Sequence, residues 1–254
     1  MGLIEIDRSL IDTYIKSFLG YGNRMAKYWL IGMEEGAADQ FEKVYKDITK
    51  WKDNGAKEFC DILEGNNEDN CIPDVKKYFY DNPVTIQKTW NKLIRLLLSI
   101  DHDIRDINEI REFQKHHLGK KYGNNCLIDF FPLPNVSLAD WIYEGKISLK
   151  FLNNRKELIR EMAPVRIERI CDKIKIYKPK VIVFYNNSPN YIKFWKQIIG
   201  SELKYDSEKK YSINVRDGVI YSVIPHPNKP GISNKDYENL GLDIRALLKL
   251  FDKG

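Results

Sequence analysis

The chain has 254 residues, of which 43% are hydrophobic and 12% aromatic, and its formal net charge is +5 at pH 7. These values are typical of one ordinary globular domain, and no apolar run is long enough to span a membrane. The first residues contain acids and no apolar signal segment, so we expect a cytoplasmic protein without a membrane partner. We also expect the protein to be monomeric. The four cysteines are scattered singly without a CxxC pair, so neither a metal nor a cofactor is expected.

The secondary structure is predicted from the spacing of apolar residues. Helical spacing predicts helices over about residues 3–19, 41–51, 83–100, 104–113, 154–177, 189–199 and 234–251. Apolar runs predict strands over 28–31, 126–131, 181–185, 211–215 and 219–224. Pro132 and Pro134 are expected to stop the second strand, and Pro164 to kink or split a helix. The alternation predicts a single α/β domain over 1–254 with a mostly parallel sheet, and an insertion around 60–82.

Two strands in this pattern end in polar turns. Residues 28–31 run into Gly32-Met33-Glu34-Glu35-Gly36, and residues 219–224 run into Pro225-His226-Pro227-Asn228. In open parallel sheets, ligands bind beyond the carboxyl ends of the strands. We therefore expect the two turns to form one functional site.

The first turn supplies two carboxylates. Its glycines allow a sharp turn, and a helix that follows it would favour the ionised form of Glu34 and Glu35. An ionised carboxylate there can position a water molecule or stabilise a cationic transition state. Alternatively, both acids belong to the first turn of the helix and only complement its dipole.

The second turn supplies an imidazole. Pro225 and Pro227 restrict the backbone on both sides of His226, so its ring is held in a defined direction. A fixed imidazole can donate a hydrogen bond to an oxygen that gains charge in a transition state. Alternatively, His226 only satisfies a carbonyl of its own loop.

Other strand ends add polar side chains. Asp129 interrupts an apolar strand, where a buried carboxylate is costly unless it is paired or used. Alternatively, it lies at the exposed end of that strand. Asn186 and Asn187 follow the strand over 181–185, where an amide can contact a ligand edge or cap the next helix.

Basic and aromatic residues suggest a nucleic-acid partner. Phe130, Phe131 and Trp141 lie near the end of the second strand and can stack on a base, or pack in the core. The cations between residues 155 and 180 can contact phosphates, or form the solvated face of a helix. They are Arg155, Lys156, Arg160, Arg166, Arg169, Lys173, Lys175, Lys178 and Lys180.

The order of the motifs resembles that of the uracil-DNA glycosylase superfamily. Residues 32–36 resemble the turn after the family's first strand, which handles the water, and residues 226–228 resemble the histidine loop after its last strand. Residues 127–131 lie where the family carries its base-recognising Asn, so Asp129 is the nearest match. Residues 178–184 resemble the intervening strand. The resemblance extends from about residue 26 to residue 251, and only these short motifs are specific.

This resemblance implies a three-layer α/β/α sandwich around a mainly parallel sheet of about four strands. It also implies a DNA-repair hydrolase that flips a base into a pocket at the strand ends. Glu34, Glu35 and His226 would then be catalytic. The base-binding residues would be Gly32, Met33, Gly36, Asp129, Phe130, Phe131, Asn187, Pro227 and Asn228.

Two features of the motifs bear on the substrate. Glu35 replaces the usual Pro of the first motif, and Asp129 replaces the recognition Asn. A carboxylate accepts hydrogen bonds, so we expect a damaged or modified base that carries donor groups rather than uracil. Two other functions fit the same pattern: a catalytically silent nucleic-acid-binding module, and a hydrolase that acts on small nucleosides.

Overall fold

The computed structural model describes residues 6–36, 40–64, 66, 68, 73–104, 106–135 and 141–251. Within these residues the helices are α1 (Arg8–Ser17), α2 (Phe41–Asp53), α3 (Pro73–Phe79), α4 (Lys88–Asp101), α5 (Ile107–His116), α6 (Arg155–Tyr177), α7 (Pro189–Ile199) and α8 (Asn234–Phe251), with a short 3-10 helix η1 (Lys150–Leu152). The strands are β1 (Gly20–Gly22), β2 (Tyr28–Gly36), β3 (Phe59–Cys60), β4 (Asn125–Asn135), β5 (Val181–Phe184), β6 (Ser212–Arg216) and β7 (Val219–Val223).

The described strands form one mixed sheet in the order β3-β1-β4-β2-β5-β7-β6. Strands β4, β2, β5 and β7 are neighbours and run parallel, whereas β1 and β6 pair with them antiparallel. The α/β class is thus confirmed. The expectation of about four strands is wrong for the whole sheet, because the short strands β1 and β3 and the hairpin strand β6 extend it to seven within the described residues.

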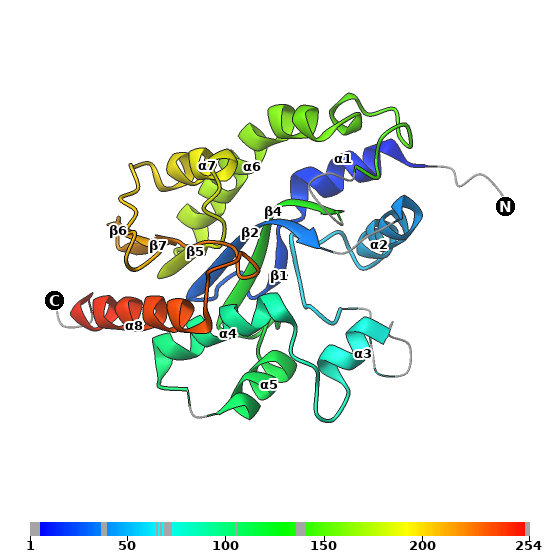
Figure 1. The fold of residues 1–254 in the computed structure, drawn as a ribbon. Helices are drawn as coiled ribbons and strands as arrows, with labels where there is room; N and C mark the ends of the chain where they lie inside the picture. Colours follow the sequence, from blue (N-terminus) through cyan, green and yellow to red (C-terminus); the bar gives the residue numbers. More distant parts are fainter. Residues whose placement is uncertain are drawn as a thin grey trace.

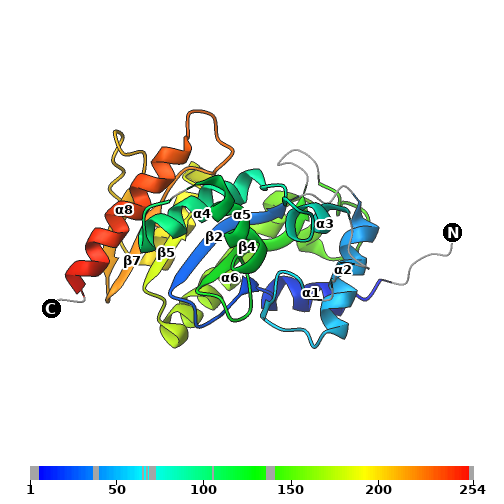
Figure 2. The same cartoon turned by 90° about the horizontal axis from the view of Figure 1, so that it is seen from below.

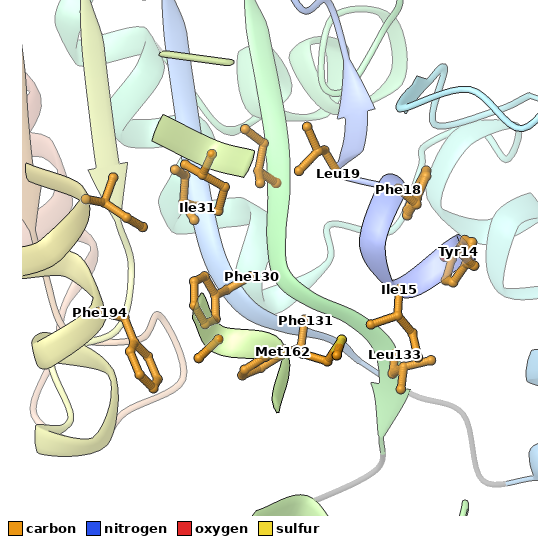
Figure 3. Close-up of a cluster of buried hydrophobic side chains, with 14 of the residues drawn as sticks. Tyr14, Ile15, Phe18, Leu19, Ile31, Phe130, Phe131, Leu133, Met162 and Phe194 are labelled. Carbon is orange, nitrogen blue, oxygen red and sulfur yellow. The ribbon is translucent and has the colours of Figure 1, made fainter. Parts of the chain in front are cut away.

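Helices cover both faces of this sheet. α1, α2, α6 and α7 lie on one face, and α4, α5 and α8 lie on the other (Figures 1 and 2). Along β2, Ile31 packs into the hydrophobic cluster under the first group and Leu30 into the cluster under the second, as strand alternation requires. Figure 3 shows part of the first cluster, with side chains from α1, β4, α6 and α7.

The expected stop at Pro132 and Pro134 is wrong. β4 continues through Pro132 and Pro134, because the register shifts there: Glu34 pairs with Phe131 and Gly36 with Asn135, so two steps on β2 span four on β4. A strand tolerates proline where its ladder is irregular. Pro164 lies inside α6 without splitting it.

One helix begins later than expected, and the predicted insertion stays a prediction. The helix expected over 83–100 begins at Lys88 instead. The loop before it is held by buried Gln114, which donates to the Tyr78 and Thr85 carbonyls and accepts from the Gln87 N–H. The segment predicted as an insertion, about 60–82, is described only in part, and α3 lies within it.

Candidate functional site

The carboxyl ends of the four parallel strands bring three predicted site residues to one edge of the sheet. Gly32 on β2 and Asp129 on β4 are direct register partners. β5 is extended by a hydrogen bond from the Tyr185 N–H to the Ile31 carbonyl (3.0 Å), and His226 follows β7. β4 and β5 lie on opposite sides of β2, and the chain crosses over from one side to the other between them. The carboxyl end of β2 is therefore a topological switch point, which is where ligands bind in open α/β sheets.

Gly32 is required by the packing of Tyr185. A Cβ atom at position 32 would overlap the phenol oxygen and ring of Tyr185. The tyrosine ring therefore lies directly over the β2 backbone, where any larger residue would collide with it. The sequence pattern predicted Tyr185 only as part of a buried strand, and its place beside the site was missed.

Asp129 lies on the same face of the sheet as Tyr185. Leu127, two residues earlier on β4, packs in the cluster under α4 and α8, so strand alternation places Asp129 on that face. Asp129 is only 8% exposed. The alternative interpretation, that it lies at the exposed end of the strand, is therefore wrong.

His226 lies next to Tyr185, with 6.1 Å between the ring centroids. Its loop is fixed at three successive carbonyls: Tyr237 donates to that of Pro225 (2.7 Å), the Lys229 N–H to that of His226 (2.9 Å), and Lys92 to that of Pro227. The histidine loop is thus anchored to α4 and α8.

The electrostatics of His226 define its hydrogen-bonding form. Burial, together with the positive charge of Lys92, lowers the pKa of His226 below its usual value. The backbone N–H of Asn228 donates to Nδ1 (3.2 Å), so that nitrogen carries no proton and Nε2 does. His226 is a neutral imidazole that can donate one hydrogen bond through Nε2. The alternative, a ring that satisfies a loop carbonyl, does not match this geometry.

Glu34 makes different contacts from those expected. Arg155, the first residue of α6, contacts both of its carboxylate oxygens, with 2.7 Å between Nη1 and Oε2. Tyr191 on α7 donates to Oε1 (3.0 Å). Burial disfavours the charged guanidinium, but the hydrogen bond and charge of Glu34 outweigh it and raise the pKa of Arg155. The carboxylate is therefore neutralised by a bidentate partner.

The alternative interpretation, that Glu34 and Glu35 belong to the first turn of a helix, is wrong, because both lie within β2 and α2 starts only at Phe41. Among the described residues, the contacts of Glu34 are with Arg155 and Tyr191, and none joins it to His226. The placement of the Glu35 side chain lies outside what the structure describes, and Gly36 pairs through its backbone with Asn135.

The remaining base-binding predictions fall into two groups. Phe130 and Phe131 are fully buried and pack with α7 in the first cluster, and Met33 packs against that cluster, so these three serve the core. The other group lies around the histidine loop, where Asn187 accepts from Lys229 (3.1 Å) and Asn228 donates to Thr89 (3.1 Å).

Most cations of the basic stretch have partners within the protein. Arg166 is fully buried and donates to four backbone carbonyls, those of Ile15, Phe18, Asp129 and Phe130. Carboxylates lie within ion-pair distance of Arg155, Arg160, Arg169, Lys173 and Lys175. These residues of α6 are therefore poorly suited to contact phosphates.

Comparison with known proteins adds no relative: no family model matches the chain, and no curated protein does either. In the described part of the chain, no helix is long and apolar enough to cross a membrane. Nor does any group of three or more His, Cys, Asp or Glu side chains there come together as a metal site.

Proposed function

We propose that this protein hydrolyses the N-glycosidic bond of a damaged or modified base in DNA. The observation that carries the proposal is the neutral His226, fixed at the carboxyl ends of the parallel strands with its donor on Nε2. Further support comes from the order β4-β2-β5-β7 with helices on both faces, which suits the α/β/α sandwich that the resemblance implies. A monomeric cytoplasmic protein is part of the same proposal.

The proposed reaction needs a donor at the leaving base. When the C1′–N bond breaks, the bonding electrons leave with the base, and the sugar becomes a cation that water attacks. A preformed donor directed at the base stabilises this developing negative charge. Because the pKa of His226 is lowered, its neutral form is available at neutral pH without first losing a proton.

Its place on the same face of the sheet as Tyr185 favours Asp129 over Glu34 as the carboxylate of this reaction, although Asp129 also interacts electrostatically with buried Arg166. Glu34 and Arg155 together carry no net charge, so Glu34 stabilises a cationic sugar weakly. Asp129 shares a face of the sheet with Tyr185, which lies against His226. We assign to Asp129 the stabilisation of the sugar and acceptance of the water proton, and to Glu34 the positioning of the β2 end.

A base-release assay tests the proposal. Oligonucleotides that contain uracil, hypoxanthine, xanthine, hydroxymethyluracil or a modified pyrimidine are incubated with the protein and cleaved with alkali at abasic sites. We expect scission at one of these bases, with losses of about 100-fold or more in His226→Ala and Asp129→Asn and a smaller loss in Glu34→Gln. Scission that His226→Ala leaves unchanged would contradict the proposal.

A catalytically silent nucleic-acid-binding module is the second candidate. It is favoured by one observation, the neutralisation of Glu34 by Arg155, which removes the carboxylate that the first motif was expected to supply. Binding of the oligonucleotides without scission of any of them would support this candidate.

A further inference from the structure

A hollow of about 550 Å³ opens beside the histidine loop. It lies between the first turns of α4 and α8, and its lining contains two lysines, three asparagines and one proline. These residues are Lys88, Asn91, Lys92, Pro227, Asn228 and Asn234. Among the described residues no carboxylate lines it, so every charged group that the structure places on its wall is a cation.

Lys92 is a fixed cation in this wall. Its Nζ donates to the Pro227 carbonyl and, at 2.8 Å, to the Ile232 carbonyl. An ammonium group has three protons, so one remains for a ligand. Burial lowers the pKa of Lys92, and the charge of Asp236 partly offsets this. Asp236 itself accepts from Lys210 and Ser233.

Two other lining residues, Asn91 and Lys88, supply donors as well, whereas the Asn228 amide NH₂ already donates to Thr89 (3.1 Å). The Asn91 carbonyl oxygen accepts from Arg95 (3.0 Å), which leaves its amide NH₂ as the group available to the hollow. The exposed ammonium of Lys88 has no ion-pair or hydrogen-bond partner among the described residues. A pocket lined by ammonium and amide donors matches a tetrahedral oxyanion that accepts several hydrogen bonds.

We propose that this hollow is a subsite for a phosphate group of the substrate, and that the phosphate belongs to a polynucleotide backbone. The position of the hollow supports a phosphate of the substrate. Pro227 and Asn228 line the hollow and directly follow His226, so a phosphate bound there lies close to the proposed hydrogen-bond donor. The identity of the polymer as DNA rests on the proposed function, whereas the phosphate site itself does not.

Oligonucleotide binding tests the subsite. The affinity of a fluorescent single-stranded 15-mer is measured by anisotropy at several salt concentrations. Lys88→Gln is expected to weaken binding about five-fold and to reduce the slope of log K against log salt by about 0.7. Lys249→Gln makes the same charge change at the far end of α8, about 22 Å from Asn234 along the helix, and should leave both values unchanged.

A neutral backbone separates the possible sources of the phosphate. With methylphosphonate linkages throughout the 15-mer, the wild-type protein and Lys88→Gln should bind equally. If Lys88→Gln instead weakens binding of thymidine monophosphate and not of the 15-mer, the backbone assignment is overturned. Equal effects of Lys88→Gln and Lys249→Gln on the 15-mer, or no effect of either, would overturn the subsite itself.

The two proposals can fail separately. A Lys88-dependent phosphate contact without base release would support the proposed subsite and contradict the proposed glycosidic activity. Base release with no Lys88-dependent binding would do the reverse. Because Lys88 is exposed and has no partner in the described part of the chain, its variant should unfold at the wild-type urea concentration, which shows that the change acts on binding.

Discussion

Arg155 contacts both carboxylate oxygens of Glu34 across the carboxyl end of the sheet, joining the first residue of α6 to the last part of β2. Both side chains are largely buried, at 17% and 11% exposure. The pair therefore fixes the strand end while cancelling the charge of the carboxylate that the first motif provides.

Removing one partner of this pair should be costly. Arg155→Met leaves a largely buried carboxylate without its counter-ion, and we expect the free energy of unfolding to fall by about 3 kcal/mol. Tyr191 would still donate to Glu34, so the loss should lie at the lower end of the range for buried pairs. Urea denaturation of the purified variant measures it.

A double-mutant cycle supplies the control. Glu34→Gln combined with Arg155→Met removes both charges, and this variant should be more stable than Arg155→Met alone. If the two single substitutions simply add, the charges do not interact, and the assignment of Glu34 as a positioning residue is wrong.

The packing of Tyr185 on Gly32 leads to a second prediction. Gly32→Ala places a methyl group inside the tyrosine ring, and we expect a loss of about 1–3 kcal/mol in unfolding free energy. Tyr185→Leu in the same chain should recover part of that loss, because it removes the ring that collides. A destabilisation of Gly32→Ala that Tyr185→Leu does not relieve would show that another contact is responsible.

Arg166 is predicted to be a structural residue. Arg166→Met would leave four buried carbonyls without their donor, and we expect a loss of about 4 kcal/mol or more. Burial lowers the pKa of Arg166 to about 9, so the guanidinium stays charged at neutral pH. Arg160→Met, an exposed arginine on the same helix, is the matched control and should change stability by less than about 1 kcal/mol.

The sequence predicted the α/β class, the central strands and the position of His226 after β7, because buried strands and strand-end turns leave strong local patterns. It did not predict β1 or β3, which are only three and two residues long. The prediction that the prolines end β4 was wrong because a register shift depends on the neighbouring strand, which the local sequence does not show.

The candidate site was less accessible from sequence, because its chemistry depends on distant pairs. Glu34 and Arg155 are 121 residues apart, and no local pattern links them. For the same reason Arg166 resembled its exposed neighbours, although it lies in the core. Asp129 stood out as a charge in an apolar run, which left open a buried carboxylate or an exposed strand end, and the structure shows that it is buried.

The lowered pKa of His226 predicts how stability depends on pH. Between the unfolded pKa of about 6.5 and the lower folded pKa, the unfolded chain binds more protons than the folded one. Stability contributed by this residue is therefore fully present above about pH 6.5 and is lost as the pH falls toward the folded value. Urea denaturation at several pH values, compared between the wild-type protein and His226→Gln, isolates this contribution from the other histidines.

The same titration predicts the pH profile of base release. If the neutral imidazole is the donor to the leaving base, the rate should be constant across neutral pH and should change only below pH 6.5, near the lowered pKa of His226. Lys92→Met removes the positive charge that helps to lower this pKa, so the change should then occur at higher pH. A profile that keeps its midpoint in Lys92→Met, in a variant that remains folded, would show that another group titrates.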